Sequence, residues 1–271
     1  MFLFKNIRHL SNDITKISFK KCPAAPVTKS TCFAVGDLET IVVNNIHYPV
    51  LAGIYFEIDD KVYHKIFSIT NTTNITNIAE ASHKMMVQYI HFMAHISKLG
   101  ISIMYFHNLN FDGMFLMNAL VQMYGNSMNF NSSIINGQIY SIDLYLGDKS
   151  MFIKCSFKLL PLSLDKLAKC LLGKDSGKMK FNTADVNRNN FELIKSDFIQ
   201  YLYNDLIITH GILKIPLLTF LKVFNVNIHK ILSASGLALR VFRTNFYDIK
   251  CSPKKFFFTK KISYILHTRQ N

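Results

Sequence analysis

Four acidic residues stand in apolar surroundings, where a lone carboxylate is costly. Asp37 and Glu39 follow an apolar run, Asp112 lies within YFHNLNFDGMFL (105–116), and Asp205 lies inside a long apolar helical pattern. Clustered carboxylates require a cation, and oxygen-rich clusters select Mg²⁺ or Mn²⁺. Two such ions ~3.5–4 Å apart can activate a water molecule and stabilise the leaving oxygen at a phosphodiester.

The spacing of these residues predicts which of them can meet. Residues two apart in a strand point to the same side, so Asp37 and Glu39 share one face of a sheet. Tyr201 precedes Asp205 by one helical turn, so its phenol can reach a group bound at that carboxylate. Each feature alone also fits an ordinary role, such as a solvated strand edge or a turn and cap residue.

Composition indicates the class of partner. The 271 residues include 31 basic and 17 acidic side chains, for a net charge of +14. This excess favours a polyanion, nucleic acid before an anionic membrane, although a basic surface kept for solubility fits as well. The hydrophobic content of 49% is enough for one large domain, with or without an appendage.

Cysteine usage and hydropathy limit the environment. The five cysteines are widely spaced with no CxxC pair, so we expect no disulfide or structural zinc and a reducing compartment. The longest apolar stretch that we considered, Tyr89 to Phe106, is broken by His91, His95 and Lys98, so we expect no membrane span. The chain is rich in Asn, Ile and Lys without Trp, which indicates an AT-rich coding source such as an organelle or a selfish element.

Periodicity predicts alternating strands and helices. The expected order is a strand at 33–36 ending in the polar residues 37–40, a hairpin of 51–58 and 61–69, a helix at 80–97, a strand at 101–106, a helix from 110 to 125, strands at 138–146 and 150–157, a short helix at 162–172, a helix at 192–213, and a further helical piece from Pro216. This order predicts an α/β layered sheet with helices on both sides.

Three motifs in this order resemble those of a known family. They are Asp37-Leu38-Glu39-Thr40 (DxE), Asn108 with Phe111-Asp112 (Asn-x-x-x-Asp), and Tyr201 with Asp205 (Tyr-x-x-x-Asp). Together, over about positions 31 to 250, they resemble the proofreading domain of family B DNA polymerases. The resemblance is closest to the protein-primed type of phages and linear mitochondrial plasmids.

Smaller features resemble the same protein-primed branch. Ser156-Phe157, in CSFKLLP, is similar to its Ser-Leu motif, with phenylalanine in place of leucine. Lys178 resembles the lysine of its catalytic site, and Lys174 and Lys180 are close rivals for that assignment. The stretch 232–247 resembles the segment that leads toward the polymerase domain.

The resemblance implies an α/β, RNase H-like fold of the DEDD exonuclease type, a mixed sheet flanked by helices. It implies that Asp37, Glu39 and Asp205 hold one Mg²⁺ or Mn²⁺ ion, and that Asp37 and Asp112 contact a second. Tyr201 would orient the attacking water and Lys178 would steady the scissile phosphate. The 3′-terminal nucleotides would be gripped by stacking and hydrogen bonds from Thr40, His107, Asn108, Phe111, Phe115, Ser156 and Phe157.

The expected organisation is a basic lead-in at 1–30, an exonuclease-like domain at 31–230, and at 231–271 the start of a connection to a polymerase domain. We expect that domain to be missing, because neither an SLYP-type motif nor DTD occurs. The expected partners are a single-stranded DNA 3′ end and a separate polymerase chain or terminal protein, in a mitochondrion. Two alternatives remain: a non-catalytic single-strand-binding remnant, and an RNase H-fold nuclease acting on RNA.

Overall fold

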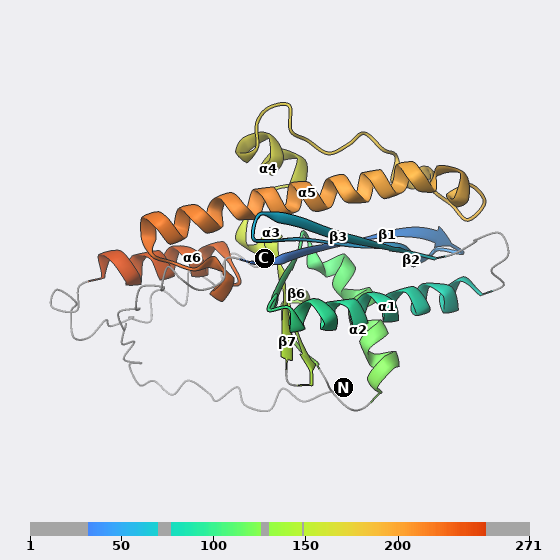
Figure 1. Cartoon of the computed structure of the whole chain (residues 1–271), viewed down its shortest axis with the longest axis horizontal. Helices are drawn as coiled ribbons and strands as arrows, with labels where there is room; N and C mark the ends of the chain where they lie inside the picture. Colours follow the sequence, from blue (N-terminus) through green and yellow to red (C-terminus); the bar gives the residue numbers. More distant parts are fainter. Residues whose placement is uncertain (1–31, 70–76, 126–129, 148, 248–271) are drawn as a thin grey trace, which may run out of the picture.

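The computed structural model describes residues 32–69, 77–125, 130–147 and 149–247 (Figure 1). One seven-stranded mixed sheet forms its centre, in the order β3-β2-β1-β4-β7-β6-β5. The strands are β1 (Ala34–Val43), β2 (Ile46–Ile58), β3 (Lys61–Ser68), β4 (Ile103–Phe106), β5 (Phe130–Ile135), β6 (Gln138–Leu146) and β7 (Lys149–Cys155). The helices are α1 (Ile78–Lys98), α2 (Leu109–Tyr124), α3 (Ser156–Leu159), α4 (Leu164–Leu171), α5 (Phe191–Phe224) and α6 (Ala234–Val241).

Short turns close three antiparallel hairpins of this sheet. The turns Asn44-Asn45, Asp59-Asp60 and Asn136-Gly137 all have positive φ, from 50° to 72°. Two-residue hairpin turns of type I′ need positive φ at both central positions, which Asn, Asp and Gly tolerate best. The β2–β3 hairpin was predicted from the sequence; the β1–β2 hairpin and β5 were not.

The centre of the sheet is parallel, and β1 pairs with β4 only near its start. Ala34 and Val35 in β1 pair with Met104 and Tyr105 in β4, which in turn runs parallel to β7. Strand β4 ends at Phe106, whereas β1 continues to Val43. The chain leaving β4 therefore turns into α2 beside the part of β1 that pairs with β2 but not with β4.

Helices cover both faces of this sheet. A Cβ at Gly36 would lie 2.5 Å from the Tyr89 hydroxyl of α1, and a Cβ at Gly53 would lie 2.6 Å from Leu206 of α5. Gly53 pairs with Asp37, the next residue after Gly36, so the two glycines face opposite sides. In Figure 1, α5 accordingly runs along one side of the β1–β3 hairpins and α1 along the other.

Helix α5 corrects one prediction. It is a single helix from Phe191 to Phe224 with Pro216 inside it, whereas the sequence predicted an end before this proline. An internal proline costs ~3 kcal/mol or more through a lost hydrogen bond and a clash. The buried face continues through Leu213, Leu217 and Leu221, so packing on both sides of the proline offsets that cost.

Among the described residues, one helix, α5, is long and apolar enough to cross a membrane, judged by its length and composition. The stretch considered from the sequence, Tyr89 to Phe106, is instead divided between α1 and β4. Half of the apolar window in α5 is buried within the protein, and α5 packs along β1 and β2. We therefore assign α5 to the core of the fold.

Two predicted boundaries shift, and some predictions fall outside the described residues. The acids of 37–40 lie within β1 instead of ending it, because Ile41 to Val43 extend the pairing with β2. Strand β7 ends at Cys155, and Ser156 begins α3. The lead-in 1–30, most of the polar loop 71–77, Asp148 of the predicted turn, and positions 248–271 lie outside the described residues.

Candidate functional site

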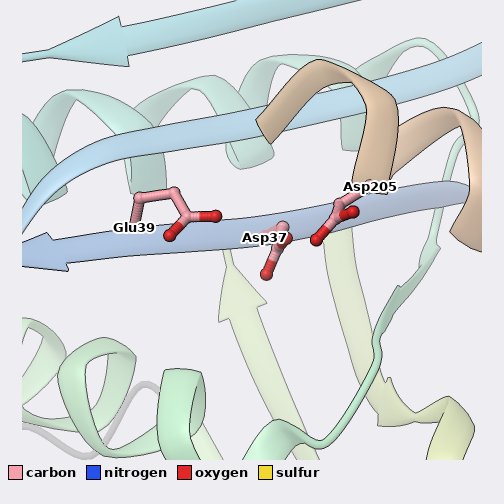
Figure 2. Close-up of side chains that lie close together, drawn as sticks. All are labelled: Asp37, Glu39 and Asp205. Atoms are coloured by element: carbon pink, nitrogen blue, oxygen red, sulfur yellow. The ribbon is translucent and has the colours of Figure 1, made fainter. Parts of the chain in front are cut away.

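Three of the predicted acids converge at the middle of β1. Carboxylate oxygens of Asp37 and Glu39 in β1 and of Asp205 in α5 all lie within 4.8 Å of one another. Figure 2 shows the three side chains gathered along the same stretch of β1. The pairing of β1 with β2 shifts register between Glu39 and Thr40, and such bulges increase local twist and re-aim side chains.

The position of Asp205 depends on a close approach of α5 to the sheet. Gly53 is the residue opposite Asp37 in β2. A Cβ there would meet Leu206, which follows Asp205 directly, at 2.6 Å. The missing side chain at Gly53 therefore lets the helix come close enough to bring Asp205 to Asp37.

The fourth acid, Asp112, adjoins this group without being part of it. It lies in the first turn of α2 and is buried, and its Oδ1 has no hydrogen-bond partner among the described residues. The Leu38 N–H, which donates to Asp37 Oδ1 at 3.1 Å, also lies near enough to the Asp112 carboxylate to oppose part of the rise in its pKa. After burial, the charge of Asp112 is the largest cause of the raised pKa of Asp37. A shared ion at Asp37 and Asp112 stays a prediction.

The four acids carry more negative charge than the neighbouring Lys178 neutralises. Burial first, and then the neighbouring acids, raise the pKa of Asp37 well above its usual value and that of Glu39 to about 8. Burial raises the pKa of Asp112 to about 7 and also raises the pKa of Asp205, although Lys178 opposes the latter shift. Such a donor set of oxygen atoms fits a divalent cation.

Lys178 is the lysine that lies at the acids. Its Nζ is 2.5 Å from Asp205 Oδ2 and 5.0 Å from the centre of the Tyr201 ring. Burial alone would lower the pKa of Lys178, but Asp205 and the Tyr201 hydroxyl raise it above its usual value. The side chains of Lys174 and Lys180 are exposed. The three lysines left open by the sequence are thereby distinguished by position.

Two residues hold the backbone at Lys178 and were missed from the sequence. Asp165 Oδ1 in α4 accepts a hydrogen bond from the Lys178 N–H at 3.3 Å. Asn204 Nδ2 in α5 donates to the Gly177 carbonyl at 3.4 Å. Asn204 stands directly before Asp205, which was the available signal for it; we find no sequence signal for Asp165.

Part of the predicted DNA grip forms an exposed wall beside the acids. Asn108 adopts a left-handed conformation (φ 67°) at the start of α2, with an exposed side chain that makes no capping hydrogen bond. Phe111 is 42% exposed, and its ring lies 5.1 Å from that of Phe115 and 5.4 Å from that of His47. Thr40 Oγ1 is 3.0 Å from His47 Nδ1. His47 was missed because the start of β2 was not predicted.

The remaining predicted grip residues brace the junction of β4, α2 and α3. His107 Nδ1 lies 3.0 Å from the hydroxyl of fully buried Ser156, and Nε2 lies 3.0 Å from the carbonyl of Leu162. Burial lowers the pKa of His107 to about 4, so its ring is neutral at pH 7. The Phe157 ring packs edge-on against it at 5.7 Å. Direct contact of His107, Ser156 and Phe157 with DNA stays a prediction.

Comparison with known proteins places this fold. The family model for type B DNA polymerase, organellar and viral, matches residues 96–197. This range includes Asp112 and Lys178, whereas Asp37, Glu39 and Asp205 lie outside it. No curated protein matches the sequence.

Solved structures extend the likeness beyond the matched range. Phi29 DNA polymerase with primer-template DNA and incoming nucleotides has a TM-score of 0.58 at 20% identity, covering 79% of this chain and 34% of that one. Phi29 DNA polymerase with single-stranded DNA has a TM-score of 0.53 at 20% identity, covering 71% and 32%. The family B DNA polymerase of Pyrobaculum calidifontis has a TM-score of 0.51 at 13% identity, covering 80% and 28%.

The chain thus spans about a third of the length of Phi29 DNA polymerase. At these identities the likeness shows the fold, and the predicted RNase H-like α/β sheet is confirmed. Over residues 96–197 the chain matches the family model of organellar and viral type B DNA polymerases, which agrees with the resemblance drawn from its sequence motifs.

Proposed function

We propose that this chain carries the 3′–5′ exonuclease region of a protein-primed family B DNA polymerase and hydrolyses the terminal phosphodiester of single-stranded DNA. The observation that carries the proposal is the convergence of Asp37, Glu39 and Asp205 within 4.8 Å, with Lys178 beside them. Phi29 DNA polymerase, which has a similar fold, has been solved with single-stranded DNA. The net charge of +14 supports a polyanionic substrate.

The acids fit two divalent ions, Mg²⁺ or Mn²⁺. All four donors are carboxylates, two of them have a buried oxygen without a partner among the described residues, and burial and crowding raise their pKa values. Asp37, Glu39 and Asp205 would hold one ion, and Asp37 with Asp112 the other. Bound there, the ions would supply a water activated for attack and a stabilised leaving oxygen.

The protein's own residues would position the reactants. The Tyr201 hydroxyl, which hydrogen-bonds at Asp205, would orient the attacking water. Lys178 keeps a positive charge beside the acids and would contact the scissile phosphate. Asn108 and Phe111 present an amide and an aromatic face at the surface, suited to a terminal nucleotide.

In this proposal the exonuclease domain spans 31–230 and the connection toward a polymerase domain begins at 231. A polymerase domain and a terminal protein would supply the remaining steps of replication. The organellar and viral description of the matching family supports an origin in a mitochondrion or its plasmid.

The test is digestion of 5′-labelled single-stranded DNA with Mg²⁺ or Mn²⁺. We expect a ladder shortened from the 3′ end, and its loss in Asp37→Asn. The matched control is Asp197→Asn, which removes an exposed acid of α5 and should cut like wild type. Absence of metal-dependent cutting, with binding retained, would instead establish a single-strand-binding remnant. Faster cleavage of an RNA oligonucleotide of the same sequence would establish an RNA nuclease.

A further inference from the structure

We propose that a groove beside the acids binds the bases of single-stranded DNA upstream of the 3′-terminal nucleotides. The inference rests on the proposed function and assigns residues that the sequence motifs do not include. The groove, of about 590 Å³, lies between the start of β2, the N-terminal half of α1, and α2. Its size falls in the range of ligand sites, which is roughly 300–1,000 Å³.

A continuous set of contacts joins the acids to this groove. Thr40, the residue after Glu39, meets His47 at 3.0 Å. The His47 ring contacts Phe111, the residue before Asp112, at 5.4 Å between ring centres. Phe111 in turn meets Phe115 at 5.1 Å. His47 and Phe115 both line the groove, so a strand whose end lies at the acids would leave along this aromatic path.

The lining of the groove suits nucleobases better than phosphates. Ile46 and Met114 are 55% and 59% exposed at its walls and offer apolar contact. Asn118 and Gln122 stand one helical turn apart, hydrogen-bonded at 3.4 Å, and their exposed amides can donate to and accept from base edges. None of the described residues that line the groove is lysine or arginine. Bases would therefore face inward while the phosphates remain in solvent.

Stacking on aromatic rings such as His47 and Phe115 is tolerant of sequence, as a proofreading site requires. Each base stacked on an aromatic ring contributes ~1–3 kcal/mol, which corresponds to roughly 5- to 150-fold in affinity. The consequence is a dependence on strand length. Oligonucleotides long enough to reach the groove should bind more tightly than those that cover only the acids.

The test measures affinity for fluorescent single-stranded DNA of increasing length, from about 2 to about 10 nucleotides, without divalent metal so that cleavage does not interfere. We expect wild type to gain about tenfold or more between the shortest and longest strands. Met114→Glu should lose most of this gain and keep its affinity for the shortest strand. The control, Val62→Glu, places the same charge on a residue that is also about half exposed, on β3 at the far end of β2.

A second measurement separates docking of DNA from a folding defect. Met114→Glu and Val62→Glu should unfold at the same temperature within about 2 °C, since both sites are exposed. 4-Thiothymidine placed upstream of the 3′ end should crosslink to the peptide containing Met114. Equal length dependence in both variants, or a crosslink elsewhere, would overturn the groove assignment.

These results are independent of the cutting assay. A length gain that depends on Met114 without cleavage supports the groove and refutes the exonuclease. Cleavage without a gain of affinity with strand length supports the exonuclease and refutes the groove. A groove that binds an apolar peptide and no DNA would show that its occupant is a protein.

Discussion

Replacing Asp112 by asparagine should stabilise the metal-free protein. Asp112 is buried, its Oδ1 has no partner among the described residues, and its charge opposes that of Asp37. Asparagine has the same shape, carries no charge, and can turn an N–H donor toward the remaining acids. The exchange should therefore remove repulsion without opening a cavity.

The magnitude follows from the pKa of Asp112, which burial raises from 3.8 to about 7. An acid with a raised folded-state pKa keeps its proton in the folded protein while the unfolded chain releases it, so stability falls as pH rises from about 4 to about 7. Each pKa unit is worth ~1.4 kcal/mol, which sets a ceiling of about 4 kcal/mol. The pKa values of the neighbouring acids are coupled, so the full ceiling is not reached. We expect Asp112→Asn to raise the free energy of unfolding by about 2–4 kcal/mol at pH 8 and by under about 1 kcal/mol at pH 4.5.

The assay is thermal and urea unfolding with a chelator at both pH values. At pH 8 the gain should raise the midpoint by about 5–15 °C, from the usual ~2–4 °C per kcal/mol for chains of this size. Asp197→Asn is the control, because it removes an exposed acid from the same protein. A variant that is less stable than wild type at pH 8, or a gain of equal size at pH 4.5, would refute this account of the cluster.

Three further predictions concern the same site. Mg²⁺ should raise the unfolding temperature more at pH 8 than at pH 6, because binding displaces protons; a pH-independent rise would contradict this. Lys178→Met should lower the free energy of unfolding in urea by about 1–3 kcal/mol at pH 8, because it leaves buried Asp205 without its ion-pair partner. The control Lys180→Met should change the free energy of unfolding by under about 0.5 kcal/mol. Gly53→Ala should lower the free energy of unfolding by about 1–3 kcal/mol, because its Cβ would lie 2.6 Å from Leu206. It should also weaken Mg²⁺ binding measured by calorimetry. Adding Leu206→Ala should restore Mg²⁺ binding if this clash is the cause.

The parts of the site that sequence could predict are those governed by a regular period. The i, i+2 spacing of Asp37 and Glu39 and the i, i+4 spacing of Tyr201 and Asp205 each follow from one element. Their meeting across elements came only from the resemblance. Lys178 could not be separated from its neighbours, because its loop has no period and its position depends on contacts from α4 and α5.

The missed elements had local signals that were not used. Asn136-Gly137 is a strong two-residue hairpin turn, and it joins the unpredicted β5 to β6. Asn44-Asn45 similarly joins β1 to the unpredicted start of β2, which carries His47. The helix continues through Pro216 for another reason: burial along one face of α5 outweighs the local cost of the proline.

The arrangement of the backbone around β1 explains how a cluster of mutually repelling acids can persist. At Gly36 an added Cβ would lie 2.4 Å from Met104, and at Gly53 it would lie 2.6 Å from Leu206, so the sheet is tightly packed on both faces beside Asp37. The backbone therefore cannot move apart to separate the charges. The repulsion is therefore relieved only when a proton or a cation binds. The two compete for the same carboxylate oxygens, so the raised pKa values predict that a divalent cation binds the cluster more weakly as the pH falls.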